Sequence, residues 1–250
     1  MASKINQYSN QLIIINGIFI FIWLLISIFP FIWTFWGSFK VKADFFSRAE
    51  WTYALSGFNT LIETGATTTV KAYVESWTEG EFWRATMNTV IVTVSVVSIS
   101  LFLGTLGAYA LSRSTFKYTF YILIAALIFR AMPHITLVSG YLFPFFQLNI
   151  WGILPTTIIV LVAINQPFTL WLLYSFFKTV PKELDESALI DGCSYFQAFR
   201  YIIMPVMWPG VVTAGLFSMM LAYNDFTVTA LLLNQQNYTC LLYTSDAADE

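Results

Sequence analysis

The sequence predicts an all-α protein that crosses a membrane several times. Hydrophobic residues make up 58% of its 250 residues and charged residues only 10%, and the mean hydropathy is +0.69. The apolar residues gather in runs of about twenty or more, the length of a membrane-spanning helix, rather than in the short alternating segments of a β-barrel. This composition excludes a soluble globular domain and predicts one polytopic membrane domain.

The first part of the chain contains one predicted span and a long loop. A polar lead over residues 1–11 precedes the span, which covers residues 12–37 and is long enough to cross a bilayer with some tilt. A cleaved signal peptide is the alternative, but the apolar run is too long and no cleavage site of small residues follows it. Residues 38–81 mix both charges with glycine and threonine, which predicts a loop on the outer face.

The rest of the membrane core is expected over residues 82–239. Four further spans are predicted over residues 82–111, 118–143, 151–177 and 210–233. Residues that break helices should interrupt the span over 118–143: Pro133, Gly140 and Pro144. Gly104 and Gly107 lie in the span over 82–111, where they should let a second helix approach closely.

The only long polar interruption in the second half, over residues 179–209, predicts two short helices joined at a glycine. Pro181 suits the first turn of a helix. Acidic residues follow at the positive end of its dipole: Glu183, Asp185 and Glu186. Apolar residues share one face: Leu184, Ala188 and Leu189. Asp191-Gly192 should end this helix.

The second short helix is predicted to begin at Ser194, because Gln197 three residues later completes a capping box. Its buried side chains should be Phe196, Phe199 and Ile203. Pro205 and Pro209 are expected to end it. An ordinary helix resting on lipid headgroups is the alternative interpretation of this amphipathic pair.

The spacing within this polar stretch resembles a known sequence motif. Glu186-Ser187-Ala188, Asp191-Gly192 and Ile202-x-Met204-Pro205 resemble the "EAA" motif of ABC-importer permeases, in which EAA is followed by G and then by I-x-L-P. Ser187 replaces an alanine and Met204 replaces the leucine. In that family this loop is the coupling helix, which sits in a groove of the cytoplasmic ATPase.

Two further stretches resemble signatures of the carbohydrate-uptake branch of the family. Asn88-Thr89 and the run from Ala108 to Arg113, AYALSR, resemble its "NT … AYALAR" signature. Asn224-Asp225-Phe226 resembles W-N-[DE]-F, with Tyr223 in place of the tryptophan. The chain therefore resembles MetI-like permeases of type I ABC importers, in the MalG-like carbohydrate branch, whose fold has six spans; five are expected here.

This resemblance implies a translocation subunit that works by alternating access and is not itself an enzyme. The implied partners are a cytoplasmic ABC ATPase dimer that uses the ATP, a homologous second permease, an extracytoplasmic solute-binding protein and the lipid bilayer. No cofactor and no nucleic acid are expected. The alternatives are a permease of the same fold for a polyamine, phosphate or another solute, and a non-transporting membrane sensor or scaffold.

The resemblance also implies the functional residues. Those expected to couple the permease to the ATPase are Glu186, Ser187, Ala188, Asp191, Gly192 and Pro205. Glu186 would contact the ATPase groove, and Gly192 would supply the turn between the short helices. For the translocation pathway the candidates are Arg130, Asn224 and Asp225. Arg130 lies deep in a span, where a charge is costly, so a structural pair with Asp225 is the alternative to a pathway role. For Asn224-Asp225 the alternative is a helix cap.

Other chemistry is not supported by the sequence. The chain has one histidine, His134, no HExxH zinc motif and no glycine-rich phosphate loop, so no catalytic residue and no metal site are predicted. Cys193 and Cys240 have neither zinc-ligand spacing nor a disulfide framework.

The distribution of basic residues predicts the orientation. One face collects them: Lys4, Arg113, Lys117, Lys178, Lys182 and Arg200. The short connection over 147–152 on the opposite face has no Lys or Arg, so the amino terminus and the polar stretch over 179–209 are predicted to be cytoplasmic, in the inner membrane of a prokaryote.

The last residues do not fit the rest of the pattern. Residues 240–250, CLLYTSDAADE, are polar and acidic where the family would continue into another span. Their back-translation resembles a sequencing-library adapter. We therefore expect residues 240–250 to be non-biological and the sixth span to be missing.

Overall fold

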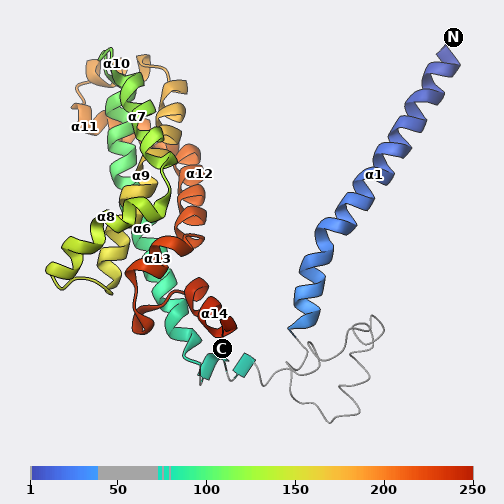
Figure 1. Cartoon of the computed structure of the whole chain (residues 1–250). Coiled ribbons are helices and arrows are strands. Elements are labelled where there is room, and N and C mark those ends of the chain that lie inside the picture. Colours follow the sequence, from blue (N-terminus) through green and yellow to red (C-terminus); the bar gives the residue numbers. More distant parts are fainter. Residues whose placement is uncertain (1, 39–72, 75, 79, 250) are drawn as a thin grey trace, which may run out of the picture. The chain divides into compact units, whose positions relative to one another are not determined.

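The computed structural model describes residues 2–38, 73–74, 76–78 and 80–249 (Figure 1). The chain divides into two compact units, Met1–Gly80 and Glu81–Glu250.

Helix α1, Ala2–Gly37, dominates the described part of the first unit. Its apolar segment, Leu12–Phe35, is long enough to cross a membrane. Large apolar side chains lie on every side of this segment. The polar lead expected over residues 1–11 is not a separate segment, because the helix already begins at Ala2. The outer loop expected over residues 38–81 falls largely outside the described residues.

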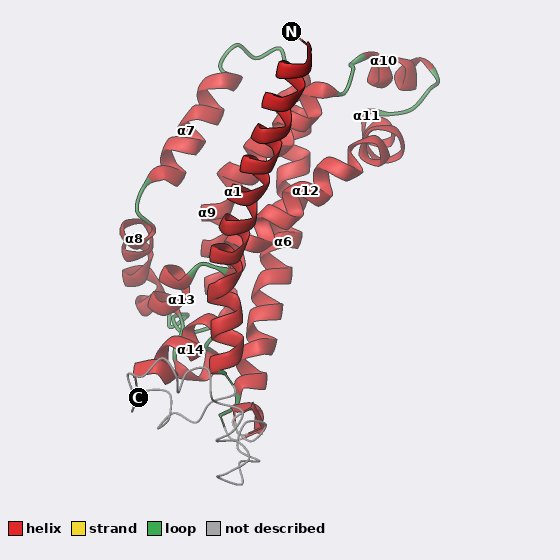
Figure 2. Cartoon of the chain, turned by 90° about the vertical axis from the view of Figure 1, so that its right-hand side faces the viewer, coloured by secondary structure: helices red, strands yellow, loops and turns green. Residues whose placement is uncertain are grey.

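The second unit is a bundle of helices (Figure 2). In order along the chain these are α6 Phe82–Arg113, α7 Thr119–Ala131, α8 His134–Gln147, α9 Leu154–Thr179, α10 Glu183–Ile190, α11 Tyr195–Ala198, the π-helix η1 Phe199–Ile203, α12 Met204–Tyr223, α13 Phe226–Leu232, the 3-10 helix η2 Gln235–Asn237 and α14 Cys240–Asp249. The helices α10 and α11 lie at one end of the bundle and α13 and α14 at the other.

The predicted all-α membrane fold is confirmed for the described residues. Four helical segments are long and apolar enough to span a membrane: Leu12–Phe35, Phe82–Arg113, Leu154–Thr179 and Tyr195–Tyr223. The bent pair α7 and α8 makes a fifth span if the two are counted together, and their axes differ by 85°.

The break between α7 and α8 was expected at three residues but occurs at only one. It lies at Pro133, whose carbonyl accepts the amides of Thr136 and Leu137 at the start of α8. Gly140 and Pro144, by contrast, lie inside α8. A helical glycine costs only about 1 kcal/mol relative to alanine. Pro144 removes one backbone hydrogen bond near the end of the helix, so neither residue ends it.

The last predicted span is wrong at both ends. Pro205 and Pro209 do not end the second short helix; the helical backbone continues through η1 into α12, which starts at Met204 and contains both prolines. The helix then stops at Tyr223, ten residues before the expected end. It stops there because the Asp225 carboxylate accepts a hydrogen bond from the Val228 amide and so begins α13.

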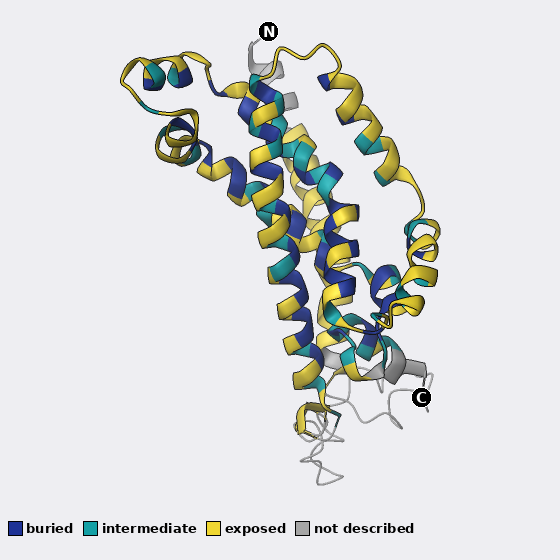
Figure 3. Cartoon of the chain, turned by 90° about the vertical axis from the view of Figure 1, so that its left-hand side faces the viewer, coloured by how far each residue is buried: buried dark blue, intermediate teal, exposed yellow. Residues whose placement is uncertain are grey.

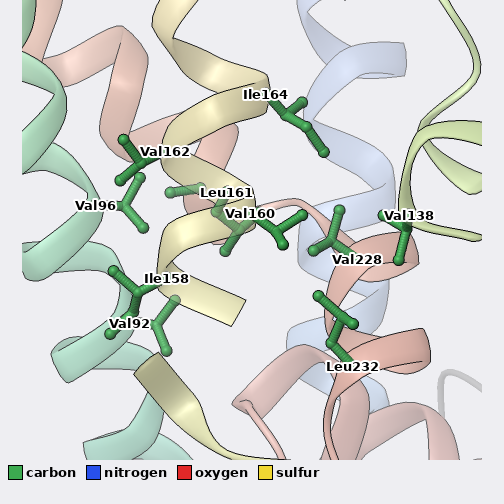
Figure 4. Close-up of a cluster of buried hydrophobic side chains, with 11 residues drawn as sticks. Val92, Val96, Val138, Ile158, Val160, Leu161, Val162, Ile164, Val228 and Leu232 are labelled. Carbon is green, nitrogen blue, oxygen red and sulfur yellow. The ribbon is translucent and has the colours of Figure 1, made fainter. Parts of the chain in front are cut away.

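Apolar packing between α6 and α9 forms the centre of the unit. Figure 4 shows Val92 and Val96 of α6 facing Ile158 and Val162 of α9, and, on the other side of α9, Val138 of α8 beside Val228 of α13. Val228 and Leu232 of α13 complete this cluster. Figure 3 shows the buried residues concentrated along the faces that the helices turn toward one another.

A second apolar cluster lies toward the end of the bundle that carries α10. It is formed by Ala108 of α6 with residues of α9, η1 and α12: Leu173, Phe177, Phe199, Ile203, Met207, Val211 and Ala214, together with Val180. This cluster joins the short helices to the spans.

The last helix, α14, lies within the segment expected to be non-biological. The Cys240 amide donates to Thr89 Oγ1 at 2.8 Å, and the Tyr243 ring lies 5.7 Å from that of Phe82. The origin of residues 240–250 stays a prediction.

The predicted close helix approach is confirmed at Gly104. A β-carbon at this position would lie 3.1 Å from side-chain atoms of Leu173 and Thr169 on α9. At Gly107 it would lie 3.1 Å from Leu170. The absence of side chains at these two positions therefore sets the α6–α9 distance.

We expect Gly104→Leu to destabilise the protein by about 1–3 kcal/mol, because the added side chain must push α9 away from α6. Gly140→Leu is the matched control, since a β-carbon there meets nothing within 4 Å. Detergent-solubilised variants compared by thermal unfolding test this. Equal midpoints for the two variants would contradict the proposed helix contact.

Candidate functional site

The polar stretch forms a helical hairpin, α10 and α11, turned at Gly192. Gly192 has φ +88°, a left-handed conformation that glycine adopts without strain. The Cys193 amide donates to the Ala188 carbonyl at 3.0 Å and the Gly192 amide to the Leu189 carbonyl at 3.1 Å. These two bonds make a Schellman motif, so the predicted helix stop at Asp191-Gly192 is confirmed.

The predicted capping box at the start of α11 is also confirmed. The Gln197 amide donates to Ser194 Oγ at 3.3 Å, and the Ser194 amide donates to Gln197 Oε1 at 2.8 Å. Both backbone donors are satisfied without help from the rest of the protein.

One of the three side chains expected to be buried here is exposed. Phe199 and Ile203 are buried as predicted, whereas Phe196 is 69% exposed. A regular α-helix would place all three on one face. The π-helix η1 begins at Phe199 and changes the spacing between Phe199 and Ile203. Phe196 lies before it in α11 and is not part of the second apolar cluster, to which Phe199 and Ile203 belong.

The hairpin is held to the spans by the guanidinium group of Arg113, at the end of α6. Arg113 Nε lies 2.7 Å from Asp185 Oδ2 on α10, and both side chains are largely buried. Arg113 Nη1 also donates to the carbonyls of Val180 at 3.1 Å and Phe177 at 3.3 Å, at the end of α9. One side chain thus joins α6, α9 and α10.

Tyr109 adds a second link from α6. Its hydroxyl donates to Asp185 Oδ1 at 2.6 Å, and its ring contacts those of Phe177 and Phe199. We call Tyr109, Arg113 and Asp185 the α6–α10 clamp. Sequence reasoning assigned Asp185 only to the helix dipole and Arg113 to the loop charge. The AYALSR run places Tyr109 and Arg113 one helical turn apart on α6, but nothing in it points to Asp185.

The residues expected to couple the permease to an ATPase fall into two groups. Those exposed on or beside the hairpin are Glu186, Ser187, Asp191, Gly192 and Pro205. Ala188, in contrast, is 1% exposed and faces the spans. The hairpin also exposes two large hydrophobic side chains that were not singled out from the sequence, Ile190 at 86% and Tyr195 at 72%, beside Phe196 at 69%.

We define the hairpin face as Glu186, Ile190, Tyr195 and Phe196. Glu186 and Ile190 are four residues apart on α10 and so share one side of that helix. Exposed apolar side chains next to an acidic residue are the composition expected of a protein-docking surface.

The three predicted pathway residues do not form one cluster. Arg130 Nη1 donates to the Ile164 carbonyl at 3.1 Å and lies 3.4 Å from Asn165 Oδ1. Its guanidinium carbon is 5.6 Å from the Phe168 ring centroid. Arg130 therefore binds α9 beside Pro167, and in the described chain it forms no ion pair with Asp225.

Asp225 has two other partners. Its Oδ1 caps α13 by accepting from the Val228 amide at 2.9 Å, and its Oδ2 lies 3.0 Å from Nδ1 of His134, the first residue of α8. Asn224 is exposed and its amide donates to the Met220 carbonyl at 2.8 Å. Of these two residues, Asp225 therefore forms a helix cap, as the alternative interpretation predicted.

Comparison with known proteins identifies the family. Residues 97–244 match the family model of the binding-protein-dependent transport system inner membrane component. The chain belongs to this family. Among its relatives, the diacetylchitobiose uptake system permease protein NgcG of Streptomyces coelicolor is 29% identical over 89% of this chain and 70% of its own length. The trehalose/maltose transport system permease protein MalG of Thermococcus litoralis is 32% identical over 83% of this chain and 70% of its own.

A solved structure supports the same fold. The crystal structure of a bacterial ABC transporter that imports the acidic polysaccharide alginate matches with a TM-score of 0.68 at 19% identity, covering 94% of this chain and 78% of the other. The predicted MetI-like permease fold is therefore confirmed. The chain is a permease subunit of an ABC importer and a multi-pass inner-membrane protein.

We expect a double-mutant cycle between Arg113→Gln and Asp185→Asn to give a coupling energy of about 1–3 kcal/mol, because the pair is largely buried and directly bonded. Arg84 and Glu81 provide the matched control: they lie 2.9 Å apart but are 48% and 58% exposed. Such an exposed pair should couple by about 0–1 kcal/mol. Unfolding in mixed detergent micelles supplies the energies. The clamp would be refuted if its coupling did not exceed that of the Arg84–Glu81 pair.

Proposed function

We propose that this permease is the translocation subunit of an ATP-driven importer for sugars or sugar derivatives. Its relatives include permeases whose names specify diacetylchitobiose, trehalose/maltose and maltodextrin transport. The proposed partners are a second homologous permease, two cytoplasmic ATPase subunits on which ATP is hydrolysed, and an extracytoplasmic solute-binding protein. The permease itself needs no cofactor in this arrangement.

The observation that carries the coupling role is the hairpin face together with the α6–α10 clamp. The hairpin face offers exposed apolar side chains and Glu186 to a protein partner. Behind it, Asp185 is bonded to Arg113 and Tyr109 of α6. A displacement of α10 by an ATPase would therefore pull directly on α6 and, through the Val180 and Phe177 carbonyls, on α9.

Charge supports a cytoplasmic position for this end of the bundle. Arg113, Lys117 and Lys178 lie at or just beyond the ends of α6 and α9 that adjoin the hairpin, and Lys182 and Arg200 lie within it. The connection between α8 and α9 at the other end has no Lys or Arg. Cytoplasmic loops are enriched in these residues. With one span before the outer loop, the amino terminus would also be cytoplasmic.

The proposed solute pathway runs beside Pro167, which lies inside α9. Pro167 has no amide hydrogen to give to the turn before it, and Arg130 donates to the adjacent Ile164 carbonyl. Asn165 Nδ2 and Gln166 Oε1 are buried without a hydrogen-bond partner in the described chain. Polar groups of this kind at mid-span are typical of transport pathways. Asn224 and Asp225, at the break between α12 and α13, would line its outer part.

We expect Gly192→Asp to uncouple ATP hydrolysis from transport while the protein still reaches the membrane. Gly192 is exposed and a β-carbon there meets nothing, so the added charge acts at the ATPase contact rather than in the core. Gly192→Asn is the matched control, because asparagine tolerates a left-handed φ about as well as aspartate and carries no charge. The measurement is solute taken up per ATP hydrolysed by the reconstituted importer. Normal uptake with Gly192→Asp would contradict the coupling role.

The proposed substrate class predicts uptake of labelled saccharides by the reconstituted importer. Diacetylchitobiose, maltose and trehalose are the probes, with spermidine and phosphate as controls. At least one saccharide should be accumulated in an ATP-dependent manner and neither control should be. Uptake of a control alone would assign the permease to another solute. Absence of any ATPase in a pull-down with the permease would instead indicate a sensor or scaffold.

A further inference from the structure

A pocket of about 460 Å³ opens at the end of the second unit opposite the hairpin. Its lining comes from the connection between α8 and α9 and from the loop that follows α13: Trp151, Leu233, Asn234, Gln236 and Tyr238. This volume lies within the range of about 300–1,000 Å³ that is usual for small-molecule sites. Under the proposed orientation the pocket faces the outside of the cell.

The wall of the pocket is fixed by bonds between these two segments. Trp151 Nε1 donates to the Leu231 carbonyl at 3.1 Å, and the Gly152 amide donates to the Leu232 carbonyl at 3.1 Å. Asn237 Nδ2 donates back to the Gly152 carbonyl at 2.6 Å. The Trp151 ring also stacks on Phe146, with centroids 5.1 Å apart. The pocket is therefore formed before any ligand arrives.

The start of α6 holds the other side of the loop. Asn88 Nδ2 donates to the Tyr238 carbonyl at 3.1 Å, and Asn88 is itself buried. Asn88 and Thr89 were noted in the sequence only as part of a family signature. In the structure they fix the loop that carries Tyr238, since Thr89 also accepts the Cys240 amide.

The lining has the chemistry of a site for a neutral, hydroxyl-rich molecule. Trp151 and Tyr238 supply flat apolar rings with a polar edge, which suit the apolar face of a sugar ring. Asn234 and Gln236 supply amides that can both donate to and accept from hydroxyls. No lining residue is charged, so nothing in the wall would compensate for a charged ligand.

We propose that this pocket binds a neutral saccharide of one or two rings at the outer mouth of the permease, with Gln236 and Tyr238 as contact residues. The inference rests on the proposed carbohydrate function and goes beyond it, because it locates a saccharide site on this chain. Such a site would hold the solute at the entrance before the spans change conformation.

The test is equilibrium dialysis of radiolabelled diacetylchitobiose, maltose and trehalose against the assembled importer in lipid nanodiscs, without a binding protein. Gln236→Leu should weaken saccharide binding about fivefold, since it removes hydrogen bonds at nearly constant size. Tyr238→Leu should weaken it about tenfold by removing the ring. Gln147→Leu, an exposed amide at the end of α8 that does not line the pocket, should leave binding unchanged.

Uptake by the same preparations, with the binding protein present, distinguishes a failure of the proposed pocket from a failure of the proposed carbohydrate function. A saccharide that is taken up but whose dialysis affinity is the same in Gln236→Leu, Tyr238→Leu and wild type would overturn the pocket and leave the carbohydrate function standing. Spermidine binding as tight as saccharide binding would overturn the proposed preference of the pocket for neutral ligands. A preparation that neither binds nor transports any of the three saccharides would overturn both proposals.

Discussion

In the second unit, the attachment of the hairpin to the spans depends on the position of the Arg113 guanidinium group. Arg113 ends α6 at the point where α9 has just ended and α10 is about to begin, and its nitrogens contact groups from both. The last carbonyls of a helix have no partner within the helix, and a charged donor is the strongest partner they can have. Arg113 therefore satisfies the end of α9 and neutralises Asp185 together. Without Arg113, the buried Asp185 carboxylate would keep only the Tyr109 hydroxyl as a donor, and the Val180 and Phe177 carbonyls would lose their charged donor.

At the breaks between helices, other groups replace the missing backbone hydrogen bonds. At Pro133 the chain turns and the proline carbonyl starts α8, and at Asp225 a carboxylate starts α13. In a membrane such replacements are needed because water cannot make them. His134 bonds Asp225 across two of these breaks. The broken helices are thus tied to one another on one side of the bundle and leave the α6–α9 packing undisturbed.

Local sequence signals predicted the local structure well. Gly192 and Ser194 lie in motifs whose hydrogen bonds span only a few residues, so the residues themselves specify the geometry. The extent of α12 and the exposure of Phe196 were not predictable in this way. The start of α12 depends on the π-helix η1, which no residue of FRYII predicts and through which the helix continues past Pro205. The exposure of Phe196 depends on which side chains of the hairpin reach the second apolar cluster, and that is a tertiary contact. The α6–α10 clamp was missed for a different reason: Arg113 and Asp185 are 72 residues apart, and only the packing of α6 on α9 brings them together.

The π-helix has a mechanical consequence. Because η1 connects α11 to α12 without a break, Tyr195–Tyr223 is one continuous helix of 29 residues. The helix bends on the way, because α11 is seen end-on where α12 runs along the bundle (Figure 2). Under the proposed coupling role, a displacement of α11 would reach α12 through continuous backbone, in addition to the side-chain contacts of the α6–α10 clamp.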